Sequence, residues 1–90
     1  MVLFVLTSPD LPRKAGFVAG RRVGGAVVRN RAKRLLRESY RRHRHRIPPS
    51  GVQLVVVARV GCGEAAYAEV ERQMLSLFDR AGMGAEDMPS

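Results

Sequence analysis

The stretch that decides the fold is GRRVGGAVVRNRAKRLLRESYRRHRHR, which runs from Gly20 to Arg46. Two adjacent glycines break the chain, and the residues after them carry apolar side chains at helical spacing. With an advance of about 100° per residue, one face of this helix collects Val28, Ala32, Leu35, Leu36 and Ser39. The pattern predicts a helix from about Ala26 to about His45 that packs this face against a sheet.

The opposite face of the predicted helix is almost entirely basic. It carries Asn30, Lys33, Arg34, Arg37, Arg41 and Arg44, with Arg29 and Arg31 at its two sides. Residues 13–46 hold 13 of the 16 basic residues and a single acid, which gives this segment a charge of +12 in a protein of net charge +8. Like charges three or four residues apart destabilise a helix, and arginine suits bidentate phosphate binding. The face therefore predicts a polyanionic partner.

Three classes of polyanion can be compared on the same residues. A helix that reads the DNA major groove needs a second helix packed across a short turn, or a dimerisation zipper, and neither pattern is present. A membrane-surface helix would carry Phe, Trp or several Leu on its apolar face. The sequence favours an RNA-binding domain, with a general RNA-binding or ribosome-associated module, and less strongly a basic DNA-binding protein, as alternatives.

The remaining elements follow from apolar runs and turn residues. The expected order is a strand over Val2–Thr7, a short strand over Lys14–Gly20 paired with it as a hairpin, the basic helix, a strand over Val52–Val60 buried on both faces, and an amphipathic helix over Glu64–Gly82. This β-β-α-β-α order predicts an α/β (α+β) two-layer sandwich. We expect residues 1–82 to form one RNA-binding domain and residues 83–90 to form a frayed tail.

No protein active site or metal site is expected. His43 and His45 point to different sides of the helix, the lone Cys62 lies in a Gly-rich turn without an identifiable base, and Glu64, Glu69 and Glu71 are expected to face solvent. The single cysteine and the absence of a signal peptide or a membrane span predict a cytoplasmic protein.

The segment GRRVGGAVVRNRAKRLLRES resembles the signature of the protein subunit of bacterial ribonuclease P. The resemblance rests on Arg29-Asn30-Arg31, Lys33-Arg34 and Arg37-Glu38, which follow a basic Val-Gly segment, and it extends from about residue 3 to about residue 82. It implies a ribosomal protein S5 domain 2-like fold. In that fold a left-handed βαβ crossover would join the strand around Phe17–Gly20 to Val52–Ala58 through the basic helix, against the usual right-handed preference.

The resemblance also implies a function. Ribonuclease P is a ribonucleoprotein endoribonuclease that removes the 5′ leader of precursor tRNA. Its catalyst is the RNA subunit with Mg²⁺ bound mainly by that RNA, so this chain would be an accessory subunit, one per RNA, with no catalytic residue and no small-molecule substrate. Its expected partners are the ribonuclease P RNA and precursor tRNA, with no membrane.

The family's binding residues can be placed on this sequence by matching positions. The resemblance implies RNA contacts by Arg21, Arg22, Arg29, Asn30, Arg31, Lys33, Arg34, Arg37 and Arg41. It implies a leader cleft between the basic helix and the sheet, lined by Phe4, Arg21, Arg29 and Asn30. An aromatic surface beside basic groups suits a single-stranded leader.

This sequence departs from the family pattern at three points. The family usually has a helix and a Phe-rich segment before the first strand, whereas Met1 leads directly into the first strand, so the N-terminal family helix is expected to be missing. Gly25 replaces the more usual Asn, and Gly20 stands where Ser is common. Neither glycine removes charge, but both loosen the start of the basic helix.

Overall fold

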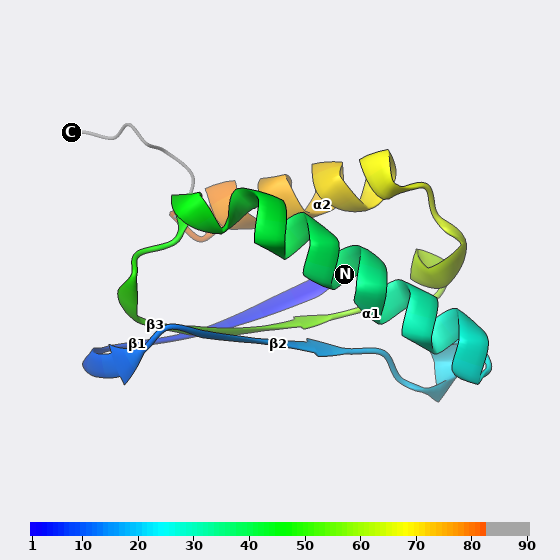
Figure 1. Cartoon of the computed structure of the whole chain (residues 1–90), viewed down its shortest axis with the longest axis horizontal. Coiled ribbons are helices and arrows are strands. Elements are labelled where there is room, and N and C mark those ends of the chain that lie inside the picture. The colour runs from blue at the N-terminus through cyan, green and yellow to red at the C-terminus, as the bar shows by residue number, and fades with distance from the viewer. Residues whose placement is uncertain (83–90) are drawn as a thin grey trace.

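A computed structural model describes residues 1–82 of the protein (Figure 1). Its elements in chain order are β1 (Val2–Pro12), β2 (Lys14–Val18), α1 (Ala26–His43), β3 (Ser50–Val57) and α2 (Tyr67–Arg80), with short 3-10 turns at Arg21–Val23, Arg44–Arg46 and Cys62–Glu64. The predicted β-β-α-β-α order and two-layer architecture are confirmed. The expected frayed tail, residues 83–90, lies outside the described residues.

The predicted hairpin between the first two strands is wrong, because β3 lies between them. The sheet order is β1-β3-β2, with β1 antiparallel and β2 parallel to β3. The first strand is longer than expected, and its register shifts between Thr7 and Pro12, where it curves past the beginning of β3. Two prolines in this curved part, Pro9 and Pro12, have no N–H for a regular ladder. The most apolar strand thus gains a partner on both sides.

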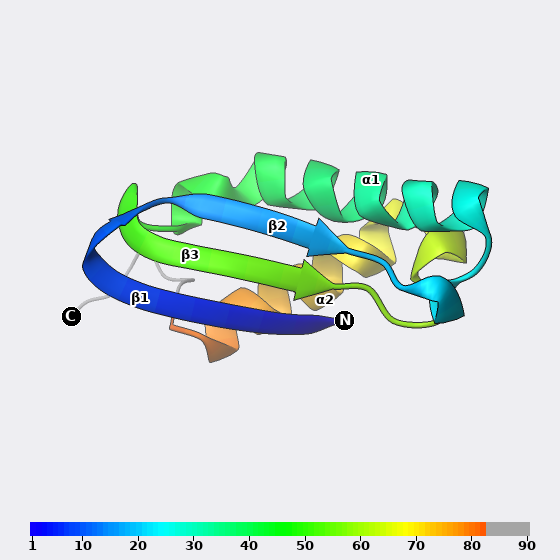
Figure 2. The same cartoon turned by 90° about the horizontal axis from the view of Figure 1, so that it is seen from below.

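The crossover from β2 through α1 to β3 is left-handed, as the family resemblance implied. In Figure 2 the sheet faces the viewer, all its helices lie behind it, and β2 lies above β3 with both arrowheads pointing the same way. Viewed from the helix side with the strands pointing upward, the chain therefore moves to the left as it passes through α1. This uncommon hand places the long basic helix across the edge strand β2.

Both helices pack on the same face of the sheet, and the other face stays open (Figure 1). The prediction that β3 is buried on both faces is therefore wrong. Its side chains alternate: Val52, Leu54 and Val56 are buried, whereas Val55 between them is 37% exposed. The largest fully buried apolar side chains are Leu36, Val56, Val70, Met74 and Phe78. Ala32, Leu35, Leu36 and Ser39 confirm the predicted buried face of the basic helix.

Each helix is shorter than predicted, for a local reason. Ile47 precedes a proline, which disfavours helical backbone, and it is extended, so α1 ends at His43 and a 3-10 turn follows. Before α2, Gly61 adopts a left-handed conformation with φ of 93°, and Ala65 and Ala66 are extended. The second helix therefore begins at Tyr67 rather than at Glu64.

None of the helices within residues 1–82 combines the length and the apolar character needed to cross a membrane.

Candidate nucleic-acid interface

Two glycines, Gly24 and Gly25, precede the first residue of α1. Gly24 has φ of 147°, and a Cβ there would lie 2.9 Å from the side chain of Val28. The amide of Arg29 donates to the carbonyl of Gly25 at 2.9 Å, which closes the first helical turn. The first turn contains no acid, so nothing on the helix itself neutralises the positive end of its dipole.

Most predicted RNA-binding residues of α1 lie on its outward side. Asn30, Arg34, Arg37 and Arg41 are exposed, and Lys33 and Arg29 are half-buried. The Nε atom of Arg29 is buried and has no hydrogen-bond partner within the described residues. Arg37 lies over the ring of Phe17, with 5.8 Å between its Cζ atom and the ring centroid. The helix thus presents guanidinium and ammonium groups in a row that can meet successive phosphates.

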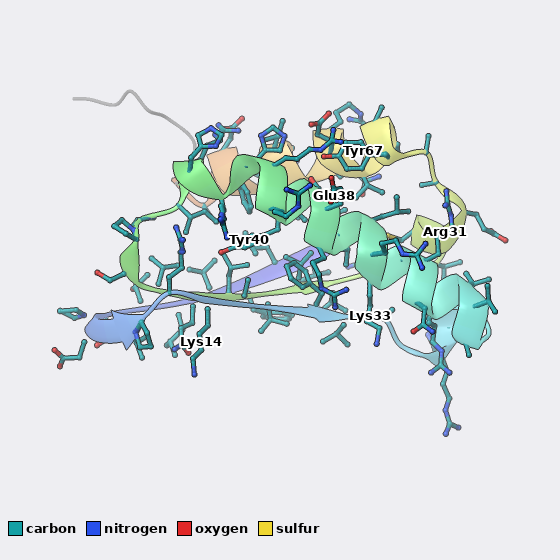
Figure 3. The ribbon with its side chains drawn as sticks, in the orientation of Figure 1. Lys14, Arg31, Lys33, Glu38, Tyr40 and Tyr67 are labelled. Carbon is teal, nitrogen blue, oxygen red and sulfur yellow. The ribbon has the colours of Figure 1, made fainter. Side chains whose placement is uncertain are left out.

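Arg31 differs from its neighbours, because its guanidinium group is engaged within the protein. Its Nε donates to the carbonyl of Gly63 at 2.7 Å, and its Nη2 donates to the carbonyl of Ala65 at 3.2 Å. In Figure 3 the side chain points from α1 toward the connection that precedes α2. This residue was predicted as an RNA contact, and the structure gives it a packing role that the sequence pattern did not indicate.

Glu38, the single acid of the basic segment, holds two arginines. It accepts hydrogen bonds from Arg41 at 3.2 and 2.7 Å and from Arg42 at 3.0 Å. These hydrogen bonds, that from Arg41 first, lower the pKa of Glu38. Arg42 also lies over the ring of Tyr67, 4.9 Å from its centroid. Figure 3 labels Glu38 on α1 and Tyr67 on α2, and Arg42 contacts both side chains.

The acids of α2 contribute further pairs on the side of α1 that faces α2. The carboxylate of Glu71 lies 2.7 Å from Nε2 of His43, and Asp79 accepts from Arg46 at 2.7 Å. Glu69 and Glu71 were expected to face solvent, and both are half-buried; Glu69 pairs with Arg72 on its own helix. No sequence signal links His43 to a residue 28 positions away. These contacts occupy the side of α1 that faces α2, and they leave Lys33, Arg34 and Arg37 without an ion pair to a carboxylate of residues 1–82.

Within residues 1–82 no group of three or more His, Cys, Asp or Glu side chains could hold a metal ion. His43 and His45 were expected to point to different sides of the helix. Their ring centroids lie 6.2 Å apart, and Nε2 of His43 contacts the carboxylate of Glu71.

The basic pair Arg21 and Arg22 occupies the 3-10 turn that follows β2, and both residues are exposed. They line an open hollow of about 460 Å³ together with Val18, Val57, Val60 and Arg59. Arg59 was not singled out in the sequence. The available signal was its position as the first charged residue after the apolar run of β3.

The structure does not bring all four predicted leader-cleft residues together. Phe4 pairs with Val55 in the ladder and is 61% exposed on the open face of the sheet, opposite the helices. Beneath the middle of α1, core side chains such as Leu36 and Val56 fill the space above the sheet. Arg29 and Asn30 lie on α1, on the other side of the sheet from Phe4. Phe4 therefore cannot line a cleft between this helix and the sheet. Phe4 shares the open face with Val18 and Val57, which lead to Arg21 and Arg22.

Comparisons with known proteins agree on one family. The family model described as Ribonuclease P matches residues 1–82. Proteins called ribonuclease P protein component from Desulfovibrio desulfuricans, Symbiobacterium thermophilum and Bacillus cereus are 47%, 44% and 36% identical over 88%, 80% and 91% of this chain. The chain spans 63%, 62% and 71% of their lengths, less than two thirds in the first two cases.

Solved structures show the same fold. The ribonuclease P protein of Thermotoga maritima superposes with a TM-score of 0.72 at 29% identity, over 87% of this chain and 74% of that one. The protein of Staphylococcus aureus gives a TM-score of 0.76 at 19% identity, over 92% and 75%.

Proposed function

The chain belongs to the ribonuclease P protein family, and from that premise we propose that it binds the ribonuclease P RNA and precursor tRNA to assist removal of the 5′ leader. One observation carries the proposal. The outward side of α1 presents Lys33, Arg34 and Arg37 without an ion pair to any carboxylate of residues 1–82, next to the exposed amide of Asn30. The carboxylates that contact α1, those of Glu38 and Glu71, lie on the side of this helix that faces α2.

The outward row of α1 suits an RNA backbone by its chemistry. Guanidinium groups make two parallel hydrogen bonds to a phosphate, and the helix holds them in place without reorganisation. Arg29 is half-buried and its Nε–H has no partner within the described residues, so a change of its side-chain rotamer would let it donate to an RNA phosphate oxygen. The protein supplies charge and position, and the chemistry of cleavage with Mg²⁺ belongs to the RNA subunit.

The single-stranded leader belongs on the open face of the sheet rather than under α1. Phe4 and Val55 lie side by side there, and the hollow with Arg21, Arg22 and Arg59 lies at one end of the same face. Exposed apolar and aromatic groups next to guanidinium groups suit bases and phosphates of an unpaired strand. This surface takes over the role that the sequence assigned to a cleft beneath the helix.

A competition experiment separates this function from general RNA binding. The full chain is bound to labelled bacterial ribonuclease P RNA at physiological salt, and unlabelled ribonuclease P RNA or an unrelated structured RNA of equal length is added. The proposed function predicts that the unrelated RNA competes at least about tenfold more weakly, a difference of about 1.4 kcal/mol. Equal competition would instead support the general RNA-binding module.

A further inference from the structure

A second hollow lies between the C-terminal half of α1 and the edge strand β2. Its volume is about 500 Å³, and its floor is the strand segment 15–17. Arg37, Tyr40, Arg41 and Arg44 line the helix side. This hollow is separate from the one at Arg21 and Arg22, and neither the family signature nor the leader surface includes its aromatic residues.

Two aromatic rings, those of Phe17 and Tyr40, form an edge-to-face pair in this hollow, called the aromatic step below. Phe17 and Tyr40 meet edge to face, with ring centroids 5.6 Å apart and an interplanar angle of 62°. The guanidinium group of Arg37 lies over the ring of Phe17. Both rings are only half-buried, although they flank the core. A half-buried aromatic step with a planar cation over it is suited to a flat π-system such as a nucleobase.

The rim of the hollow is cationic. Arg37 and Arg44 make no ion pair with a carboxylate of residues 1–82, and both are exposed. Arg41 is paired with Glu38, and a phosphate at this position would replace that carboxylate as its partner. The charges around the rings therefore favour a ligand that carries phosphate on both sides of its flat group.

The strand edge supplies hydrogen-bonding groups. Because the sheet order ends with β2, the outer edge of this strand has no partner strand among those described. The carbonyl of Val18 accepts from Ala58 on β3 at 2.8 Å. Backbone groups alternate in direction along a strand, so Ala15 and Phe17 turn their N–H and C=O groups toward the open edge. A base lying against Phe17 would find donors and acceptors there.

We propose that this hollow binds one unpaired RNA nucleotide, with its base against Phe17 and Arg37 and its flanking phosphates at Arg41 and Arg44. The inference rests on the proposed function only in taking RNA as the partner. In a paired A-form segment the faces of the bases are stacked on their neighbours and cannot contact Phe17. The site should therefore bind a bulged or looped-out nucleotide. It would extend the interface of α1 beyond the Arg-Asn-Arg region to the far end of the helix.

Three matched RNA hairpins test the site: one with a single bulged uridine, one with an abasic residue at the bulge, and one fully paired. Fluorescence anisotropy gives Kd for each hairpin with the full chain at fixed salt, in the absence of ribonuclease P RNA. The bulged hairpin is expected to bind at least about fivefold more tightly than the abasic one, the lower end of the range for one base stacked on an aromatic ring. Equal affinities for these two hairpins would overturn the proposal.

Variants assign the preference to this hollow. Phe17→Leu should remove the preference for the bulged base while leaving the affinity for the paired hairpin unchanged. Arg44→Ala should weaken the binding of the bulged and abasic hairpins. Arg80→Ala, which removes one exposed arginine from α2, is the matched control and should weaken their binding less. If Phe17→Leu weakened all three hairpins equally, or if Arg80→Ala matched Arg44→Ala, the proposed site would be wrong.

If Phe17→Leu fails to fold, the fluorescence of Tyr40 tests the site without a substitution in the hollow. The protein has no Trp and two Tyr, so Tyr67→Phe leaves Tyr40 as the single strong fluorophore. The bulged hairpin should quench its emission, and the abasic hairpin should not. Equal quenching by both would refute the site. Because no ribonuclease P RNA is present, these results are independent of whether the protein assists tRNA maturation.

Discussion

The guanidinium group of Arg31 donates to the carbonyl oxygen of Gly63 at 2.7 Å, so a residue of the basic helix fastens the connection that leads into α2. A second hydrogen bond from Arg31 reaches Ala65. Hydrogen bonds from a charged donor contribute about 1.5–3 kcal/mol when partly shielded from water. Arg31→Ala should therefore lower the free energy of unfolding by about 1–2 kcal/mol, whereas Arg34→Ala, on the exposed side, should change it by less than about 0.5 kcal/mol.

Urea denaturation of both variants measures this difference. The Arg31 assignment would be contradicted if the two variants had equal stability and equal loss of RNA affinity, since Arg31 would then act as an RNA contact alone.

Gly63 packs against α1 with no room for a side chain. A Cβ at this position would lie 2.5 Å from Cγ1 and from the carbonyl oxygen of Val28. Gly63→Ala should push the connection away from the helix and cost about 1–3 kcal/mol of stability. Gly20→Ala is the control, because a Cβ there meets nothing within 4 Å. Thermal unfolding of the two variants compares them, and an unchanged Tm for Gly63→Ala would rule out this close packing.

The exposed arginine row should be visible in the salt dependence of RNA binding. Each phosphate contact contributes about 0.7 to 0.9 to the slope of log K against log salt concentration. Arg34→Ala and Lys33→Ala should each reduce the slope by about this amount and leave the fold intact. Arg72→Ala removes the same charge on α2, where Arg72 pairs with Glu69, and should leave the slope unchanged. Identical slopes for Arg34→Ala and wild type would show that Arg34 meets no phosphate.

Glu38 competes with RNA for Arg41 and Arg42. Its pKa is lowered by hydrogen bonds from Arg41 and then Arg42, so it stays ionised near neutral pH and its pairs are lost only as pH falls below its ordinary pKa. Glu38→Gln should free both guanidinium groups and strengthen RNA binding a few-fold at low salt. The gain should shrink at high salt because of screening. Weaker binding by this variant would mean that Glu38 orients the arginines for RNA rather than withholding them.

Cys62 should react slowly with electrophiles in the folded protein. Burial raises the pKa of its thiol, and only the thiolate is nucleophilic. Iodoacetamide at about pH 8 should modify it more slowly in the native chain than in the urea-unfolded chain, where the usual thiol pKa of about 8.5 applies. Mass spectrometry of the alkylated protein follows both rates, and equal rates would show that the thiol is accessible and unperturbed.

The parts of the structure that depend on local pattern were predictable from the sequence. Leu35 and Leu36 repeat at helical spacing with Ala32, and this stripe is buried as expected. The outward position of Arg34 and Arg37 follows from the same periodicity. Helix boundaries were less accurate, because they depend on backbone conformations such as the extended Ile47 before a proline.

Relationships between distant segments could not be read from the sequence. The insertion of β3 between β1 and β2 depends on which strand edges meet after the helix returns, and no local residue specifies that pairing. The periodicity of α1 places Arg31 beside the other arginines, but its role depends on Gly63, 32 residues away. The family resemblance placed Phe4 in a cleft beside the helix, whereas its position on the open face depends on how both helices pack on one side of the sheet.

If this protein assists an RNA catalyst, it should speed the cleavage of precursor tRNA by a bacterial ribonuclease P RNA. The reaction is run at low Mg²⁺ with and without the full chain, and the rate of release of the 5′ leader is followed. We expect the full chain to raise this rate clearly, Arg34→Ala to weaken the stimulation, and Arg72→Ala to leave it unchanged. An unchanged rate of cleavage on addition of the protein would contradict the proposed function.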